Sequence, residues 1–284
     1  MGNLMLDKKK LKNLKLIVFD LDGTLLNSDG EIGAESIRLV KELKKKGVRF
    51  TIASGRLHSA ILQHAKTLDL KTPLITLDGS LIKSLDDKII FESYIPTKYV
   101  KRALNLADLF MLKIALCHAD AIYYNASGSL IPDLVEKFGA KYVEVESFEA
   151  YLNNTLEIVM VGEYKRTIKE VVRKLSFPHA FGLDISFYKS HRKGDIYFFE
   201  ARKRGVSKGK GLIRLAKRLK LNIHEIAVLG DWYNDLQLFQ TDALKIAMAN
   251  AVIEIKNLSD LVTKRTNDED GTAEFLELVL RAKE

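Results

Sequence analysis

Short apolar runs alternate with amphipathic helical segments along the first part of the chain. The first run, residues 16–19, is rich in strand-forming residues and ends at a pair of aspartates. Apolar residues then recur at helical spacing over 34–46, and a strand pattern over 48–53, a helical pattern over 57–68 and an apolar run over 74–77 follow. This alternation of strands and helices predicts right-handed crossovers and a parallel sheet.

The alternation is lost between residues 93 and 202, after a predicted hairpin of strands 81–83 and 89–91. The insert has a mixed pattern, with helices predicted over 99–108 and 128–138 and strands over 113–117, 121–124, 156–161, 185–188 and 196–200. The earlier type of pattern then returns, with a helix over 210–219, a strand over 226–229 and a helix over 272–280. We therefore expect an α/β fold: residues 1–92 and 203–284 form a Rossmann-like parallel sheet with helices on both faces, and residues 93–202 form an inserted α+β domain.

The composition is that of an ordinary globular protein. Of the 284 residues, 47% are hydrophobic and 29% are charged, which suits one large or two moderate domains. The formal net charge is +8, but the lysines and arginines are spread over predicted helices such as 41–46 and 214–220, where they form a solvated face. We therefore expect no nucleic acid partner and only a general attraction for anionic substrates.

The apolar runs are too short to cross a membrane. None approaches the length of a membrane span, and lysines interrupt the N-terminal segment that could imitate a signal peptide. Cys117 is the only cysteine, which excludes an intrachain disulfide and suits a reducing compartment. We therefore expect a cytoplasmic protein that has no membrane partner.

Two aspartates stand two positions apart where the first predicted strand ends. Asp20 and Asp22 point to the same side if the extended backbone continues past the strand, so they can converge on one small volume. Two carboxylates held together repel each other unless a cation or a shared proton stabilises them. The alternative is an Asx turn, in which Asp22 and Gly23 only reverse the chain.

A second pair of aspartates follows the last predicted strand. Asp231 and Asp235 are four positions apart, so both can reach one ion if a helix starts between them. Such hard oxygen ligands favour Mg²⁺, because zinc prefers histidine or cysteine. We expect Trp232, between the pair, to pack in the core; the alternative is that Trp232 and Tyr233 narrow the entrance to a site.

Three further polar residues stand at the ends of predicted elements. Ser54 lies between a strand and a helix, where a serine either holds an anion or only caps the helix. Lys208 falls in the first turn of a helix, where a cation is unfavourable unless it serves another charge; the alternative is a solvated lysine. Asp78 follows the third apolar run and is either another anion near the strand ends or a plain turn residue.

Together these segments resemble the four signatures of the haloacid dehalogenase-like hydrolases. The segments are DLDGTL at 20–25, SGR at 54–56, VSKG at 206–209 and GDWYND at 230–235. With the inserted domain, the ensemble resembles the Cof-type sugar phosphatases of this family, in which the insert is a cap that covers the site and selects substrates. The resemblance extends over nearly the whole chain.

The resemblance implies roles for individual residues of these segments. Asp20 is the expected nucleophile and Asp22 the expected general acid and base. The expected Mg²⁺ ligands are Asp20, the backbone carbonyl of Asp22, Asp231 and, directly or through water, Asp235. The expected phosphate-binding residues are Ser54, Gly55, Lys208 and Asn234, and the expected substrate contacts are Arg56, Asp78, Gly79 and Glu200. Asp78 departs from the asparagine that relatives usually carry.

The expected function is therefore Mg²⁺-dependent hydrolysis of small phosphate monoesters, such as sugar phosphates, through an aspartyl phosphate on Asp20. A phosphomutase or phosphotransferase would share this intermediate but deliver the phosphoryl group to a sugar. A non-catalytic binding protein is a third alternative, and the retention of all four signatures argues against it. The expected ligand is a small phosphorylated metabolite, while the sequence specifies neither the individual ester nor the oligomeric state.

Overall fold

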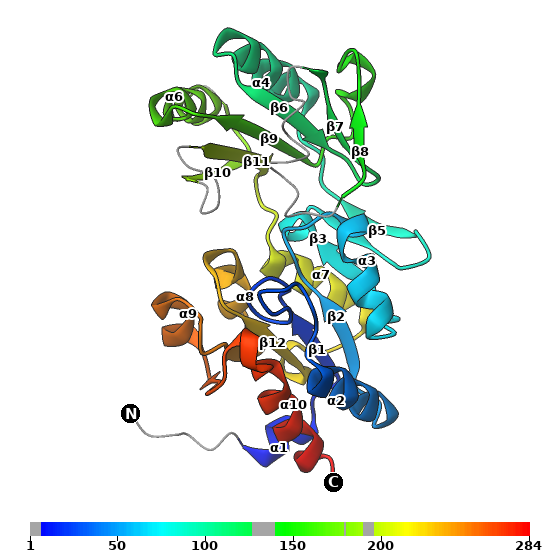
Figure 1. The fold of residues 1–284 in the computed structure, drawn as a ribbon. Coiled ribbons are helices and arrows are strands. Elements are labelled where there is room, and N and C mark those ends of the chain that lie inside the picture. The colour runs from blue at the N-terminus through cyan, green and yellow to red at the C-terminus, as the bar shows by residue number, and fades with distance from the viewer. Residues whose placement is uncertain (1–6, 127–139, 179, 190–195) are drawn as a thin grey trace. The chain divides into compact units, whose positions relative to one another are not determined.

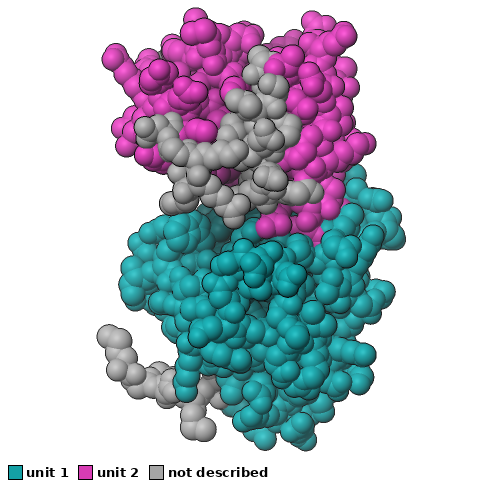
Figure 2. Space-filling view, viewed as in Figure 1, with its two compact units in different colours: residues 1–55, 62–90, 207–284 teal, residues 56–61, 91–206 magenta. Residues whose placement is uncertain are grey.

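Two compact units make up the chain (Figure 2). The computed structural model describes residues 7–126, 140–178, 180–189 and 196–284, so the helix predicted over 128–138 lies outside the described residues. The core unit comprises residues 1–55, 62–90 and 207–284, and the inserted unit comprises residues 56–61 and 91–206.

A five-stranded parallel sheet is the centre of the core unit. Its strands lie in the order β14 (Leu261–Val262), β13 (Leu244–Ala247), β12 (Ile226–Gly230), β1 (Leu16–Phe19) and β2 (Arg49–Ile52). Phe19 of β1 lies between Leu229 of β12 and Ile52 of β2 in the register. The three strands therefore end at the same edge, where the residues that follow them gather.

Helices cover both faces of this sheet (Figure 1). The four residues of β1 are all 0% exposed, which requires cover on each face because successive side chains point to opposite sides. One group of contacting helices is α1 (Lys8–Lys12), α2 (Ala34–Lys45) and α10 (Gly271–Ala282), and another is α7 (Lys208–Leu219), α8 (Leu236–Phe239) and α9 (Ile253–Leu258). The predicted α/β fold with a parallel sheet is confirmed.

The third predicted strand ends earlier than its apolar run. After α3 (His58–Thr67), β3 (Leu74–Thr76) forms a single parallel bridge with Ala53, the residue after β2, and an antiparallel sheet with β4 (Leu81–Lys83) and β5 (Ile89–Glu92). Leu77 and Asp78 have φ values of 48° and 47°, so the chain leaves the extended conformation at residue 77. The Asp78 N–H donates to the Ser54 carbonyl over 3.1 Å, which ties this turn to the end of β2.

In the described part of the inserted unit, a sheet of six strands has two helices on one face. The strand order is β10 (Leu183–Lys189), β11 (Tyr197–Lys203), β9 (Glu157–Gly162), β6 (Lys113–Cys117), β7 (Ile122–Tyr124) and β8 (Tyr142–Glu144), antiparallel except between β7 and β8. α4 (Thr97–Leu109) and α6 (Lys165–Leu175) pack on each other and on the central strands. Their shared core includes Leu116, Ile158, Met160 and Phe199.

Several elements lie outside the predicted ones, namely α1, β8, α6, β13, α9 and β14. α6 buries Ile168, Val171 and Leu175, and Val172 packs partly buried against the same core, so its apolar residues have the i, i+3, i+4, i+7 spacing of an amphipathic helix. The sequence pattern therefore indicates this helix, and its omission from the predicted elements is an error of prediction. Within the described part of the chain, no helix is long and apolar enough to cross a membrane.

Candidate functional site

Three carboxylates gather where β1 and β12 end. Asp20 directly follows β1, Asp231 directly follows β12, and Asp235 ends the 3-10 helix Tyr233–Asp235. One carboxylate oxygen from each lies within 4.8 Å of the other two. Their exposed fractions are 4%, 6% and 0%. Aspartates from both predicted pairs therefore meet at one edge of the sheet.

A buried ammonium lies among these carboxylates. Lys208 is the first residue of α7, is fully buried, and places its Nζ 2.5 Å from Asp20 Oδ1 and 2.7 Å from Asp235 Oδ1. Lys210, the other lysine at this helix start, is exposed. The Lys208 ammonium, at a helix N-terminus, forms ion pairs with Asp20 and Asp235, and the alternative of a solvated lysine is wrong.

Two glycines let α7 approach its neighbours closely. Gly79 has a φ of 92°, and a Cβ added to it would lie 2.2 Å from the Ser207 carbonyl oxygen. A Cβ on Gly209 would lie 2.0 Å from the Gln237 carbonyl oxygen. Because no larger residue fits at either position, these contacts fix the first turn of α7 and with it the backbone of Lys208.

The loop between Asp231 and Asp235 is closed by Asp235 itself. Asp235 Oδ2 accepts hydrogen bonds from the backbone N–H groups of Asp231, over 3.0 Å, and Trp232, over 3.2 Å. The three residues between the two aspartates are exposed. Trp232 and Tyr233 are each 48% exposed, and the Tyr233 hydroxyl donates to Glu254 over 3.2 Å. The expectation that Trp232 packs in the core is wrong.

The loop after β1 packs directly on Asp231. Thr24 is buried, and its Oγ1 donates to Asp231 Oδ1 over 2.8 Å. Gly23 has a φ of 80°, and a Cβ there would lie 2.4 Å from Asp231 Oδ2. The Asn250 side chain donates to the Gly23 carbonyl over 2.8 Å, and Asp22 is half-buried on the same loop. Thr24 and Asn250 were not among the predicted site residues, although Thr24 stands within the DLDGTL segment.

The carboxylate cluster carries more negative than positive charge. Burial, together with the charge of Asp235, raises the pKa of Asp20 well above its ordinary value and raises the pKa of Asp231 to about 7. Burial alone would lower the pKa of Lys208, but the charges of Asp20 and Asp235 more than offset it, and the pKa is raised. The ammonium therefore stays charged, and it contacts two of the three carboxylates.

The carboxylate oxygens of the cluster are suitable ligands for a hard divalent cation. The cluster consists of carboxylates alone, and no histidine or cysteine from the described ranges joins it. Oxygen ligands of this kind suit a hard ion that keeps water in its remaining positions. A second positive charge would also favour the ionised carboxylates, whose pKa values are raised without it.

Ser54, Gly55, Asp78 and Asn234 form a second polar group in the core unit. Ser54 is buried, and its own N–H donates to the β3 backbone over 2.9 Å, so it is not free for an anion. A Cβ on Gly55 would lie 3.2 Å from Asp78 Oδ1, which accepts a hydrogen bond from Asn234 Nδ2 over 3.3 Å. Because α3 begins only at His58, Ser54 does not cap it, and the capping alternative is wrong.

The remaining predicted residues, Arg56 and Glu200, belong to the inserted unit. Glu200 on β11 is buried, accepts a hydrogen bond from the Tyr188 hydroxyl over 2.7 Å, and lies 3.1 Å from the Arg202 guanidinium. Arg56 is half-buried. The carboxylate cluster of the core unit is built without either residue.

The chain is similar to known proteins over nearly its whole length. A family model for haloacid dehalogenase-like hydrolases matches residues 17–276. Phosphatase YwpJ of Bacillus subtilis is 27% identical over 94% of this chain and 100% of that protein. 5-Amino-6-(5-phospho-D-ribitylamino)uracil phosphatase YitU of the same organism is 24% identical over 92% of this chain and 96% of that protein. A crystal structure of a haloacid dehalogenase-like hydrolase from Bacteroides thetaiotaomicron matches with a TM-score of 0.82 at 26% identity, covering 93% of this chain and 98% of that one.

Proposed function

The chain belongs to the haloacid dehalogenase-like hydrolases as a Cof-type phosphatase, and we propose that it hydrolyses small phosphate monoesters with Mg²⁺ through an aspartyl phosphate on Asp20. The observation that carries the proposal is the 2.5 Å pairing of Asp20, at the end of β1, with the buried ammonium of Lys208. Two further carboxylates lie beside this pair. Such an arrangement offers a nucleophile, a fixed cation and ligands for a divalent ion.

Asp20, Asp231, Asp235 and the backbone carbonyl of Asp22 are the proposed Mg²⁺ ligands. When bound, the ion supplies positive charge that offsets the repulsion between the phosphate dianion and the carboxylates. Thr24 orients the Asp231 carboxylate by donating to one of its oxygens.

In the proposed reaction, the Asp20 carboxylate attacks the phosphorus atom of the ester. The bond between phosphorus and the alcohol oxygen breaks, and Asp22 gives the leaving oxygen its proton. Asp22 then takes a proton from a water molecule, whose oxygen attacks the same phosphorus atom and releases inorganic phosphate and free Asp20. Lys208 favours the ionised Asp20 that attack requires, against the rise in pKa that burial causes.

The Ser54 hydroxyl, the Gly55 backbone N–H and the Asn234 amide are the proposed donors to the phosphoryl oxygens. This assignment is supported by the proximity of these residues in the core unit, where Gly55 and Asn234 both lie next to Asp78. These neutral groups would donate hydrogen bonds to the phosphoryl oxygens, while Lys208 and the ion would supply the positive charge.

The inserted domain, residues 93–202, is the proposed cap that selects the leaving group. All the residues assigned to chemistry lie in the core unit, so the reaction can stay the same while the accepted substrates differ. The proposed substrate contacts are Arg56, Asp78, Gly79 and Glu200. A small phosphorylated metabolite is the proposed ligand, and the relative YitU is named for such a compound.

Phosphate release from a panel of small metabolite phosphates and an activated aryl phosphate tests the proposal. We expect release only with a divalent ion, and none from Asp20→Asn although circular dichroism shows it folded. An acceptor sugar separates hydrolysis from transfer, because a hydrolase releases the same inorganic phosphate with or without it. Full activity after chelation, or in Asp20→Asn, would overturn the proposal.

A further inference from the structure

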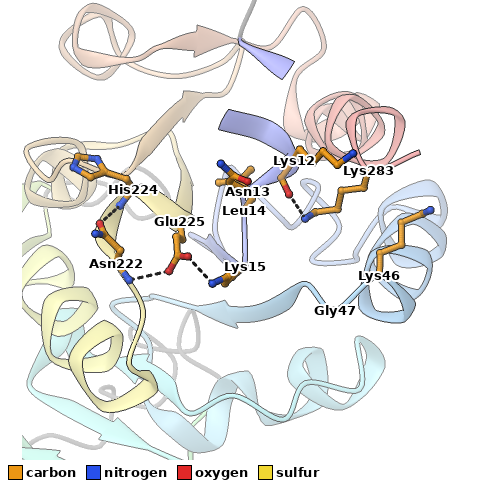
Figure 3. A pocket seen from close by; sticks show the side chains of 10 residues that line it. All are labelled: Lys12, Asn13, Leu14, Lys15, Lys46, Gly47, Asn222, His224, Glu225 and Lys283. Carbon is orange, nitrogen blue, oxygen red and sulfur yellow. Dashed lines mark hydrogen bonds and ion pairs between the residues drawn. The ribbon is translucent and has the colours of Figure 1, made fainter. Parts of the chain in front are cut away.

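A basic cavity of about 660 Å³ lies in the core unit, and Figure 3 shows the residues that line it. Its wall includes residues that directly precede β1 and β12, such as Lys15 and Glu225. These strands run from the cavity to Asp20 and Asp231, a span on the order of 15 Å. The cavity is therefore separate from the site already described.

The cavity wall has a surplus of positive charge. Lys12, Lys15, Lys46 and Lys283 line it together with one carboxylate, that of Glu225, so four lysines against one acid leave three positive charges in excess. Lys15 pairs with Glu225 over 2.6 Å, and the Lys283 ammonium donates to the Lys12 carbonyl over 2.6 Å. Among the described residues, the ammonium groups of Lys12 and Lys46 have neither an ion pair nor a hydrogen bond.

Helix ends account for part of this charge. α1, α2 and α10 all end at the cavity, with Asn13, Lys46 and Lys283 as their C-terminal caps, and lysines favour the negative end of a helix. However, burial and the charges of Lys12 and Lys46 lower the pKa of Lys283. Three helix ends carry partial charges of about −0.5 each, roughly −1.5 in total, which does not offset three positive charges, so an anion in the cavity would relieve their repulsion.

We propose that this cavity binds a compact phosphate-bearing polyanion. Its volume suits a small ligand, and ammonium groups on several sides suit a phosphate group as point charges. Asn13, Asn222 and His224 add polar side chains to the wall. Leu14 is the apolar side chain of the lining, and it is only 1% exposed, so the imidazole of His224 is the one aromatic ring that this lining offers a nucleobase. A polyphosphate or a phosphorylated polyol fits this lining better than a nucleotide.

Titration of the full-length, ¹⁵N-labelled protein with inorganic pyrophosphate tests the proposal. The titration is followed by amide chemical shifts in the presence of a chelator, so that no divalent ion draws the probe to the carboxylate site. Gly47 and Lys15 line the cavity and report on it, whereas Gly23 and Gly55 report on the carboxylate site. We expect saturable shifts of the Gly47 and Lys15 amides.

A double variant and a matched control locate the binding. Lys12→Gln combined with Lys46→Gln should weaken pyrophosphate binding at least about tenfold, because two charged partners are lost. Lys66→Gln, an exposed lysine on α3 in the core unit, should leave the affinity unchanged. Thermal melting of each variant confirms that it is folded.

Three results would overturn the proposal. They are the absence of saturable shifts at Gly47 and Lys15, reproduction of these shifts by sodium chloride of equal ionic strength, and unchanged affinity in the double variant. Saturable shifts at Gly23 and Gly55 alone would place the probe at the carboxylate site and count against the cavity. The proposal does not rest on the catalytic assignment, so phosphatase activity of the double variant is measured separately and is expected to remain.

Discussion

Replacement of Lys208 by methionine tests the charge balance of the core unit. Lys208→Met keeps a side chain of similar length but removes the ammonium that lies within 2.7 Å of both Asp20 and Asp235. Both carboxylates are buried, at 4% and 0% exposure, and a buried carboxylate without its cation takes up a proton rather than stay charged. The loss of stability is then at most the cost of that protonation, because burial already raises the pKa of Asp20 in the wild type, and this cost depends on pH.

The magnitude follows from the ordinary pKa of aspartate, 3.8. Protonation of one carboxylate costs about 1.4 kcal/mol for each pH unit above that value, so the deficit is at most about 4 kcal/mol at pH 7 and at most about 1.5 kcal/mol at pH 5. Removing one partner of a buried ion pair typically costs a similar amount, about 3–5 kcal/mol. Because the folded state favours the protonated form, the variant's stability deficit grows as pH rises.

Urea denaturation followed by circular dichroism, with chelator at both pH values, measures this deficit. Lys210→Met is the matched control, since Lys210 is exposed on the same helix and its replacement should change the free energy of unfolding by less than about 0.5 kcal/mol. A deficit of equal size at both pH values, or no deficit at pH 7, would refute the reasoning.

Other predictions concern the neighbouring residues. Gly23→Ala should lower activity at least about tenfold and raise the Mg²⁺ midpoint, because its Cβ would lie 2.4 Å from Asp231 Oδ2; a wild-type midpoint in a Mg²⁺ titration would contradict this. Asp231→Ala should shift that midpoint far more than Asp78→Asn, and equal shifts would make Asp78 a ligand. The pKa of Asp231, raised from 3.8 to about 7 mainly by burial, predicts that the metal-free protein loses Tm as pH rises from about 4 to about 7, and a flat profile over this range would count against it. Glu200→Gln should alter the ranking of natural phosphates more than the rate on an aryl phosphate; equal losses would indicate structural support only.

The core fold could be predicted because its strands are buried on both faces. The run 16–19 reads as a strand from composition alone, since helices on each side require apolar residues at every position. α6 was missed although Ile168, Val171 and Leu175 recur at helical spacing along it, so its omission was not forced by the sequence. The early end of β3 depends on the left-handed backbone of Leu77, for which a leucine gives no signal.

The meeting of Asp20 and Asp231 could also be anticipated, because both follow parallel strands that end at one edge. The position of Lys208 between Asp20 and Asp235 could not be derived from spacing, because it depends on the close packing of α7 around Gly79 and Gly209. The exposure of Trp232 likewise depends on the conformation of its loop, which Asp235 holds by accepting the Trp232 backbone N–H. Sequence patterns thus did not predict the positions of residues that depend on tertiary packing.

The central claim is that Asp20 carries the phosphoryl group during turnover. Asp22→Asn, supplied with an activated aryl phosphate, is the best source of the intermediate, because this leaving group needs no proton whereas the attacking water still needs a base. Acid quenching and peptide mass spectrometry should find one phosphoryl group on the peptide that contains Asp20, and none in Asp20→Asn. Release of one equivalent of the aryl alcohol with the phosphoryl group on another residue, or on no residue, would contradict the account.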